Sequence, residues 1–184
     1  MKGGKTILAK ERFKLTVERL CHELIEKYED FTDTCIIGVQ ERGVLLADRV
    51  LERLSILSPK TEIEYGKLDI TFYRDDFRTR KEPLKASSTE INFLIENKKV
   101  ILIDDVLYTG RTIQASLAAI QDFGRPAQVE LLTLVDRRFN RHLPICSDYT
   151  GITVDALDEA YVKVEWEKLD GQDRILLFSA KRKN

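Results

Sequence analysis

The sequence contains no long apolar run. In a chain of 184 residues, no stretch approaches the ~18 consecutive apolar residues of a membrane-spanning helix. The opening residues, Met1 to Lys5, are not followed by the apolar core of a signal peptide. Hydrophobic residues make up 43% and charged residues 33%, as in soluble globular proteins. We therefore expect a cytoplasmic protein in which residues 1–184 form a single domain.

Cysteine and histidine are both scarce. The three cysteines, Cys21, Cys35 and Cys146, are odd in number and lack the spacing of a metal site. Cys21 and Cys35 lie among apolar residues, so we expect reduced thiols in the core. For the two histidines, His22 and His142, no partner is indicated, so we expect surface or structural roles rather than catalysis.

An excess of charge of one sign is also missing. The net charge is −1 and the isoelectric point about 6.2, which argues against nucleic-acid binding through bulk charge. A local basic patch stays open. The basic residues 181–183 are expected to be a solvated terminus.

The most informative stretch is an apolar run that ends in two acids. Val100–Ile103 is followed directly by Asp104 and Asp105, then by a short loop over 106–112, and then by an apolar helical pattern over 113–120. A continuous apolar run of this length predicts a strand buried on both faces. A strand, loop and helix form half of a βαβ unit, in which ligands bind beyond the carboxyl ends of the strands.

The loop has the chemistry of a phosphate site. The first amides of a helix lack intrahelical partners and carry positive partial charge, and Gly110 allows close backbone approach. Thr109 and Thr112 add hydroxyl donors. The lysine and glycine spacing of nucleotide-binding P-loops is missing, and so is the G-x-G-x-x-G pattern. Two acids before such a loop suit a sugar phosphate, although an acidic turn with a threonine helix cap is the plainer alternative.

Periodicity over the rest of the chain predicts an α/β protein with a mostly parallel sheet flanked by helices on both faces and an antiparallel hairpin at the C-terminal end. Residues 74–90 are charged and polar, and we expect a mobile segment there. The elements expected are a helix over 10–29, a strand over 34–39, a helix over 44–54, a strand over 62–73, a strand over 99–104, a helix over 112–123 closed by Gly124, a strand over 128–135, a turn over 155–157, and a hairpin of 161–167 and 174–178 around Asp170-Gly171.

At these residues the chain resembles phosphoribosyltransferases with the phosphoribosyl pyrophosphate (PRPP) signature, an apolar strand, two acids and a loop ending Thr-Gly-x-Thr. The longer string over 104–112, Asp-Asp-Val-Leu-Tyr-Thr-Gly-Arg-Thr, is similar to the PyrR family of pyrimidine operon regulators and uracil phosphoribosyltransferases. Further matches lie at 42–43, 68–76, 124–126, 134–137, 143–145 and 148–151.

The resemblance implies a phosphoribosyltransferase-like fold with a mobile hood, and an enzyme that makes UMP and pyrophosphate from uracil and PRPP. It implies catalytic roles for Asp104, Asp105 and Arg74, with Mg²⁺ held by Asp104 and Asp105 through water. Hood closure at Arg74 would exclude water. The implied phosphate-binding residues are Glu41, Arg42, Gly43, Val106, Leu107, Tyr108, Thr109, Gly110, Arg111 and Thr112, and the implied base-binding residues are Val135, Asp136 and Arg137. Glu41 stands where the family commonly has threonine, so we expect its carboxylate to point away.

The resemblance also implies binding of a pyrimidine leader RNA through a basic face, and a homodimer or higher homo-oligomer. The candidate RNA-binding residues are Arg19, His22, Lys27, Arg138 and Arg141. The chain departs from the family at Cys146 and Ile152, where an arginine and a lysine are usual, and one extra residue lies between Asp136 and Cys146.

Lost cations mean lost phosphate contacts, so we expect weakened RNA binding. Two alternatives stay open: an RNA-binding attenuator with incidental catalysis, and a purine phosphoribosyltransferase. The residues Leu107-Tyr108 and Leu134–Arg137 disfavour the purine enzyme.

Overall fold

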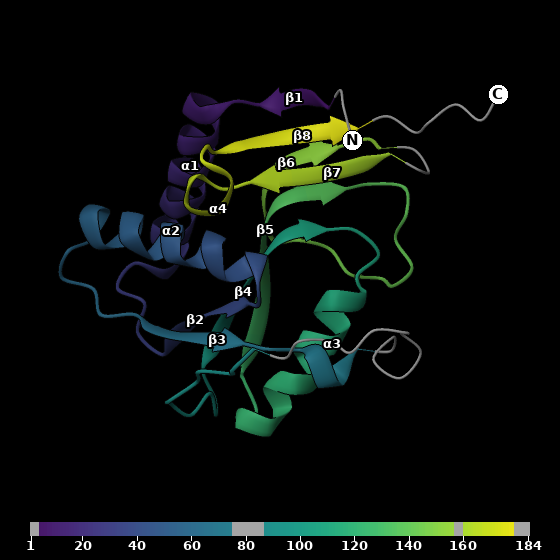
Figure 1. The fold of residues 1–184 in the computed structure, drawn as a ribbon. Helices are drawn as coiled ribbons and strands as arrows, with labels where there is room; N and C mark the ends of the chain where they lie inside the picture. The colour runs from purple at the N-terminus through teal and green to yellow at the C-terminus, as the bar shows by residue number, and fades with distance from the viewer. Residues whose placement is uncertain (1–3, 75–86, 157–159, 179–184) are drawn as a thin grey trace.

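A parallel sheet forms the centre of the molecule (Figure 1). The structure, a computed structural model, describes residues 4–74, 87–156 and 160–178. The five strands lie in the order β3 (Glu64–Leu68), β2 (Thr34–Val39), β4 (Lys99–Leu107), β5 (Gln128–Arg137) and β6 (Tyr149–Val154), and every neighbouring pair is parallel. The predicted fold class is therefore confirmed.

Helices cover both faces of this sheet, as predicted. Helices α1 (Lys10–Tyr28) and α2 (Arg42–Leu57) lie on one face and α3 (Arg111–Ile120) on the other (Figure 1). Side chains alternate along β4, so Ile101 and Ile103 join the core under α1 and α2, whereas Val100 and Leu102 join the core under α3. Within the described residues, none of the helices has the length and apolar character needed to cross a membrane.

A second, antiparallel sheet joins the two ends of the described chain. Its order is β1 (Lys5–Leu8), β8 (Arg174–Phe178) and β7 (Tyr161–Glu165). The predicted C-terminal hairpin is present, although its connection holds a short helix, α4 (Glu167–Asp170), before Gly171 at φ 79°. The Trp166 ring meets the Phe13 ring edge-on at 5.3 Å between centroids, which ties this sheet to α1.

The strand expected over 62–73 is wrong in its extent. β3 ends at Leu68, and Thr71–Tyr73 form a 3₁₀ turn, η1. The Asp69 carboxylate accepts hydrogen bonds from the Thr71 amide at 2.8 Å and the Thr71 hydroxyl at 2.6 Å, which turns the chain out of the sheet. Most of the segment expected to be mobile, 75–86, lies outside the described residues, as do Leu157 and the basic residues 181–183.

Strands β4 and β5 run further than the sequence predicts. β2 pairs with β4 only up to Gly38 and Ile103, but β5 pairs with β4 as far as Leu107 and Asp136. Because β5 continues to supply hydrogen-bonding partners, the strand runs past its predicted end at Asp104, and Asp105 also lies within it. α3 begins one residue before its predicted start but ends at Ile120, and a 3₁₀ turn, η2 (Gln121–Phe123), completes the predicted helical stretch before Gly124.

Candidate active site

Two buried carboxylates lie where β4 extends past the end of β2. Asp104 is 7% exposed and Asp105 is 8% exposed. Burial and the neighbouring Asp105 raise the pKa of Asp104, and burial raises the pKa of Asp105 against the opposing charge of Arg42. Buried carboxylates with raised pKa values are under-compensated, so they favour a positively charged group in the adjoining space.

A cavity of about 260 Å³ opens beside Asp104. Residues 106–113 line it together with Arg74. The guanidinium of Arg74 lowers the pKa of Asp104 in opposition to burial. Arg74, Asp104 and the loop, which the sequence analysis placed in one site, thus lie around one cavity.

The loop leads into α3 with the backbone geometry that a phosphate cradle needs. Gly110 is the residue before the helix and has φ 90°, a conformation that side chains disfavour. The Thr109 hydroxyl accepts a hydrogen bond from the Arg111 amide at 3.4 Å. The first-turn amides of α3 have no partner within the helix, so their positive ends are directed towards the loop.

The turn at residues 40–41 and the first two residues of α2, Arg42 and Gly43, also reach the acids. A Cβ atom on Gly43 would lie 2.5 Å from the Ile103 carbonyl oxygen and 3.0 Å from the Asp104 Cα, so only glycine allows this approach. Arg42 donates a hydrogen bond to the Val164 carbonyl at 2.8 Å and lowers the pKa of Asp105. Glu41 is exposed, and the Gln40–Glu41 peptide is cis.

The predicted base-binding residues lie at the end of β5, and none of them lines the cavity beside Asp104. The predicted base-binding residues are Val135, which is buried, Asp136, which is half-buried, and Arg137, which is 5% exposed. The Arg137 guanidinium lies 3.9 Å from the centroid of the Tyr108 ring and donates to the Ala160 carbonyl at 2.7 Å. Sequence reasoning missed this contact, because nothing local to either residue indicates the other.

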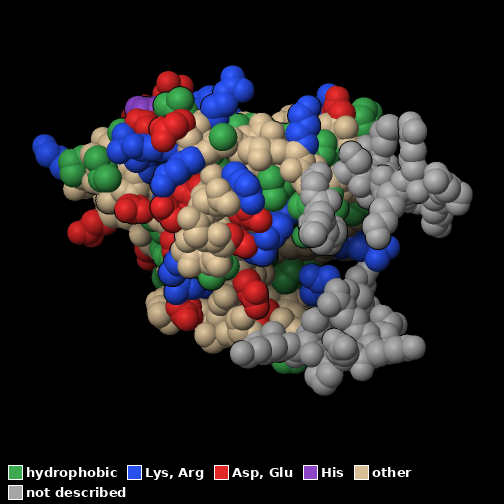
Figure 2. All heavy atoms as spheres, turned by 45° about the horizontal axis from the view of Figure 1, so that its top comes forward, with side chains coloured by type: hydrophobic (Ala, Val, Ile, Leu, Met, Phe, Trp, Pro, Cys, Tyr) green, Lys and Arg blue, Asp and Glu red, His purple; other side chains and the backbone are tan. Residues whose placement is uncertain are grey.

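The five candidate RNA-binding residues do not form one patch of unpaired cations. Arg19 donates to the Thr150 and Gly151 carbonyls and pairs with Glu23, and Lys27 pairs with Glu130. Arg138 pairs with Asp155 and Arg141 with Asp136, whereas His22 is exposed. The face in Figure 2 likewise shows Lys and Arg side chains interspersed with Asp and Glu side chains.

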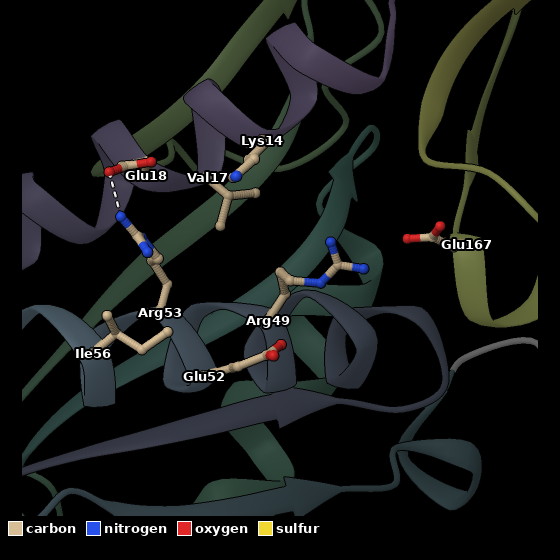
Figure 3. A pocket seen from close by; sticks show the side chains of 8 residues that line it. All are labelled: Lys14, Val17, Glu18, Arg49, Glu52, Arg53, Ile56 and Glu167. Atoms are coloured by element: carbon tan, nitrogen blue, oxygen red, sulfur yellow. Dashed lines mark hydrogen bonds and ion pairs between the residues drawn. The ribbon is translucent and has the colours of Figure 1, made fainter.

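Another cavity lies between α1 and α2 (Figure 3). It has a volume of about 430 Å³, and its lining side chains carry charges of both signs. Arg53 pairs with Glu18 at 2.5 Å, the contact drawn in Figure 3, and Arg49 pairs with Asp173 at 2.9 Å. Both lining arginines therefore have acidic partners, and Glu52 and Glu167 add negative charge, so this cavity does not have the anion preference of the loop at α3.

Asp104 and Asp105 suit a metal ion, such as Mg²⁺, that takes only a few of its ligands from the protein. Within the described residues, no group of three or more His, Cys, Asp or Glu side chains could hold a metal ion. Two carboxylates can hold Mg²⁺ when waters and substrate oxygens supply the remaining ligands. Asp104 and Asp105 meet that requirement.

Comparisons with known proteins agree with this geometry. The chain matches the family model described as "Phosphoribosyl transferase domain" over residues 3–168. The bifunctional protein PyrR of Elusimicrobium minutum (strain Pei191) is 41% identical over 173 residues, which cover 94% of this chain and 96% of that protein. The bifunctional protein PyrR of Bacillus cereus (strain AH820) is 40% identical over 181 residues, 97% of this chain and 99% of that protein.

Solved structures show the same fold at low identity. A hypoxanthine phosphoribosyltransferase from Staphylococcus aureus has a TM-score of 0.70 and 21% identity, covering 97% of this chain and 93% of that chain. The hypoxanthine phosphoribosyltransferase of Trypanosoma cruzi has a TM-score of 0.71 and 14% identity, covering 96% and 97%. At such identities the likeness concerns the fold alone.

Proposed function

Because the chain belongs to the phosphoribosyltransferases, and within them to the PyrR family, we propose that it makes UMP and pyrophosphate from uracil and PRPP. The structural observation that supports this is the buried carboxylate of Asp104, which lines a cavity together with residues 106–113, next to the equally buried Asp105. A sugar phosphate needs both parts, since its anion suits the amides of α3 and its hydroxyls suit the carboxylates.

The same arrangement suggests how PRPP would lie. Its 5′-phosphate would bind the loop 109–112, and its ribose hydroxyls would donate to Asp104 and Asp105. Its pyrophosphate would lie between Arg74 and the loop 41–43, where the amides of Arg42 and Gly43 begin α2. Uracil would then lie against the end of β5 at 135–137.

The reaction replaces the bond from C1 to pyrophosphate with a bond from C1 to a uracil nitrogen. Positive charge develops on the ribose ring and negative charge on the departing pyrophosphate. Asp104 and Asp105 would stabilise the ring, and Arg74 would stabilise the leaving group. The two carboxylates would also hold Mg²⁺ through water, and that ion supplies charge neutralisation for the pyrophosphate oxygens.

A second candidate function is UMP-dependent binding of a pyrimidine leader RNA. The relatives at about 40% identity are named bifunctional, which favours it. The ion pairs of Lys27, Arg138 and Arg141, and the replacement residues Cys146 and Ile152, count against tight binding. We therefore propose that the protein acts mainly as an enzyme and binds RNA weakly.

The deciding experiment is a base panel. The purified protein is given PRPP and Mg²⁺ with uracil, hypoxanthine, guanine or adenine, and pyrophosphate release is followed for each base. We expect kcat/KM for uracil to exceed that for each purine by at least ~10²-fold, and chelation of Mg²⁺ to abolish turnover. Faster turnover of hypoxanthine would favour the purine enzyme, and no turnover with any base would reject the proposed reaction.

A further inference from the structure

The segment after β5, residues 138–145, folds back onto residues 109–112, to which the 5′-phosphate of PRPP is assigned. Residues 109–112 are called the phosphate loop below. The amides of His142 and Leu143 both donate to the Thr109 carbonyl oxygen, at 3.0 and 3.3 Å. The Leu143 and Ile145 side chains lie 3.3 Å from where a Cβ atom of Gly110 would be. This is the segment in which the resemblance places cations for RNA, yet here its backbone and apolar side chains support the loop.

Arg141 adds a side-chain contact to the residue just before this loop, Tyr108. Its side chain is only 22% exposed, its Nη1 donates to the Tyr108 carbonyl oxygen at 2.6 Å, and its Nη2 pairs with Asp136. The Arg137 guanidinium stacks on the Tyr108 ring at 3.9 Å. Tyr108, the residue before the phosphate loop, is therefore held at its carbonyl by Arg141 and at its ring by Arg137.

We propose that Arg141 is a positioning residue for PRPP, which fixes the Tyr108 carbonyl and so keeps residues 109–112 in the conformation that accepts a phosphate. The inference rests on the proposed function, because it assigns the loop to the phosphate of PRPP. A planar guanidinium holds its five donors in a rigid fork, so it bonds a carbonyl and a carboxylate at once in fixed directions, whereas the three donors of a lysine rotate on a flexible stem. Held in this way, the loop is already formed before substrate arrives.

Loss of this restraint should act on binding rather than on chemistry. If only a fraction of the molecules hold the loop in the binding conformation, the apparent Kd is the intrinsic Kd divided by that fraction. Once PRPP is bound the site is complete, so kcat is retained. UMP carries the same phosphate, and its affinity should fall by a similar factor.

The test compares Arg141→Gln with Arg141→Lys and a matched control, Arg53→Gln. Arg53 is also part-buried, with 30% of its side chain exposed, and it pairs with Glu18 at 2.5 Å between α1 and α2 (Figure 3). It lines a different cavity from residues 109–112. We expect Arg141→Gln to raise KM for PRPP and Kd for UMP by about tenfold, with kcat changed less than about twofold. Arg141→Lys should lie between wild type and Arg141→Gln.

Two further readouts separate positioning from general stability. Arg53→Gln should lower Tm as Arg141→Gln does but leave KM for PRPP unchanged. Amide hydrogen exchange at 109–112 should accelerate in Arg141→Gln and not in Arg53→Gln. If Arg141→Gln does not fold, the comparison of Arg141→Lys with wild type decides the matter.

An unchanged KM for PRPP in the Arg141 variants, or an equal rise in Arg53→Gln, would overturn the inference. A wild-type protein that turns over no base with PRPP would overturn the proposed function instead, so the two failures are distinguishable.

Discussion

The charge of Asp104 or Asp105 can be removed without changing the shape of the side chain, because asparagine replaces the carboxylate with an amide of the same size. We expect Asp104→Asn or Asp105→Asn to lower kcat/KM for uracil by at least ~10²-fold, about 2.7 kcal/mol of transition-state stabilisation. The reason is that an amide does not attract the positive charge that develops on the ribose ring. Steady-state kinetics with PRPP and uracil at saturating Mg²⁺ measure the effect.

Both variants should remain folded, since burial already disfavours the charged form of each carboxyl and raises its pKa. Thermal unfolding is the control. Wild-type rates in both variants would remove the acid pair from the mechanism.

Gly110 is the residue at which backbone conformation and ligand contact coincide. We expect UMP to raise the Tm of the wild type through preferential binding to the folded state, and Gly110→Val to abolish that rise. A valine there would have to adopt φ 90° and would crowd Leu143 and Ile145. The measurement is Tm with and without UMP.

Gly171→Val is the matched control for backbone strain, since Gly171 has φ 79° with no atom within 4 Å of a Cβ. It should lower Tm but keep the shift with UMP. A full UMP shift in Gly110→Val would show that the phosphate binds elsewhere.

At the scale of elements, one buried carboxylate connects α1 to strands β5 and β6 of the parallel sheet. Glu130 on β5 is 3% exposed and accepts hydrogen bonds from the Tyr28 hydroxyl at 2.5 Å and the Tyr149 hydroxyl at 2.7 Å. Lys27 of α1 and the Gln128 side-chain amide also donate to this carboxylate. Burial alone would raise the pKa of Glu130, but the hydrogen bonds from Lys27, Tyr28 and Tyr149 outweigh it, and the pKa lies below its ordinary value.

The free energy of unfolding should therefore depend on Glu130 in a pH-dependent way. A lowered pKa stabilises the fold above the ordinary carboxyl pKa, and this stabilisation disappears as pH falls through the native pKa. We expect Glu130→Gln to cost about 2 kcal/mol near pH 7 and clearly less below about pH 4. Urea unfolding at several pH values measures the difference.

The control is Glu167→Gln, which removes the exposed pair with Lys10 and should change stability little at any pH. An equal cost of Glu130→Gln at pH 7 and at acid pH would contradict the assigned charge state.

Elements with strong local signals could be predicted from sequence, whereas those defined by distant partners could not. The apolar run Val100–Ile103 and the loop after it predict β4 and α3 because each signal is continuous along the chain. β1 is four residues long and pairs with β8, so nothing near it indicates a strand. The end of β4 was misplaced because β5 decides where pairing stops.

The same division applies to the site. Asp104 and the loop 109–112 are adjacent in sequence, so their association could be predicted. The contact of Arg141 with the Tyr108 carbonyl joins residues 33 positions apart through a side-chain direction that periodicity does not encode. The resemblance placed Arg141 on an RNA-binding face, although the fold turns most of its side chain inward.

At the scale of the whole molecule, charge determines whether nucleic acid binds. We expect RNA binding to be weak or absent at about 0.15 M salt, because the net charge is −1 and Arg19, Lys27 and Arg138 have partners within the protein. The measurement is a titration of the organism's own pyrimidine leader RNA with UMP present. The salt dependence should be shallow, since few phosphates are contacted.

Nanomolar binding that requires UMP would contradict this expectation. Arg19, Lys27, Arg138 and Arg141 would then be the first residues to substitute, each to glutamine, to see which alters the salt slope.

The pairing of β1 with β8 has a consequence for synthesis on the ribosome. β1 and α1 emerge first, but the strand that pairs with β1 and the Trp166 ring that packs on Phe13 belong to the last part of the described chain. Until that part leaves the exit tunnel, Phe13 on α1 stays uncovered, while the strands of the parallel sheet can already associate. The small sheet should therefore close last, and nascent chains that stop before Trp166 should be the ones that bind chaperones.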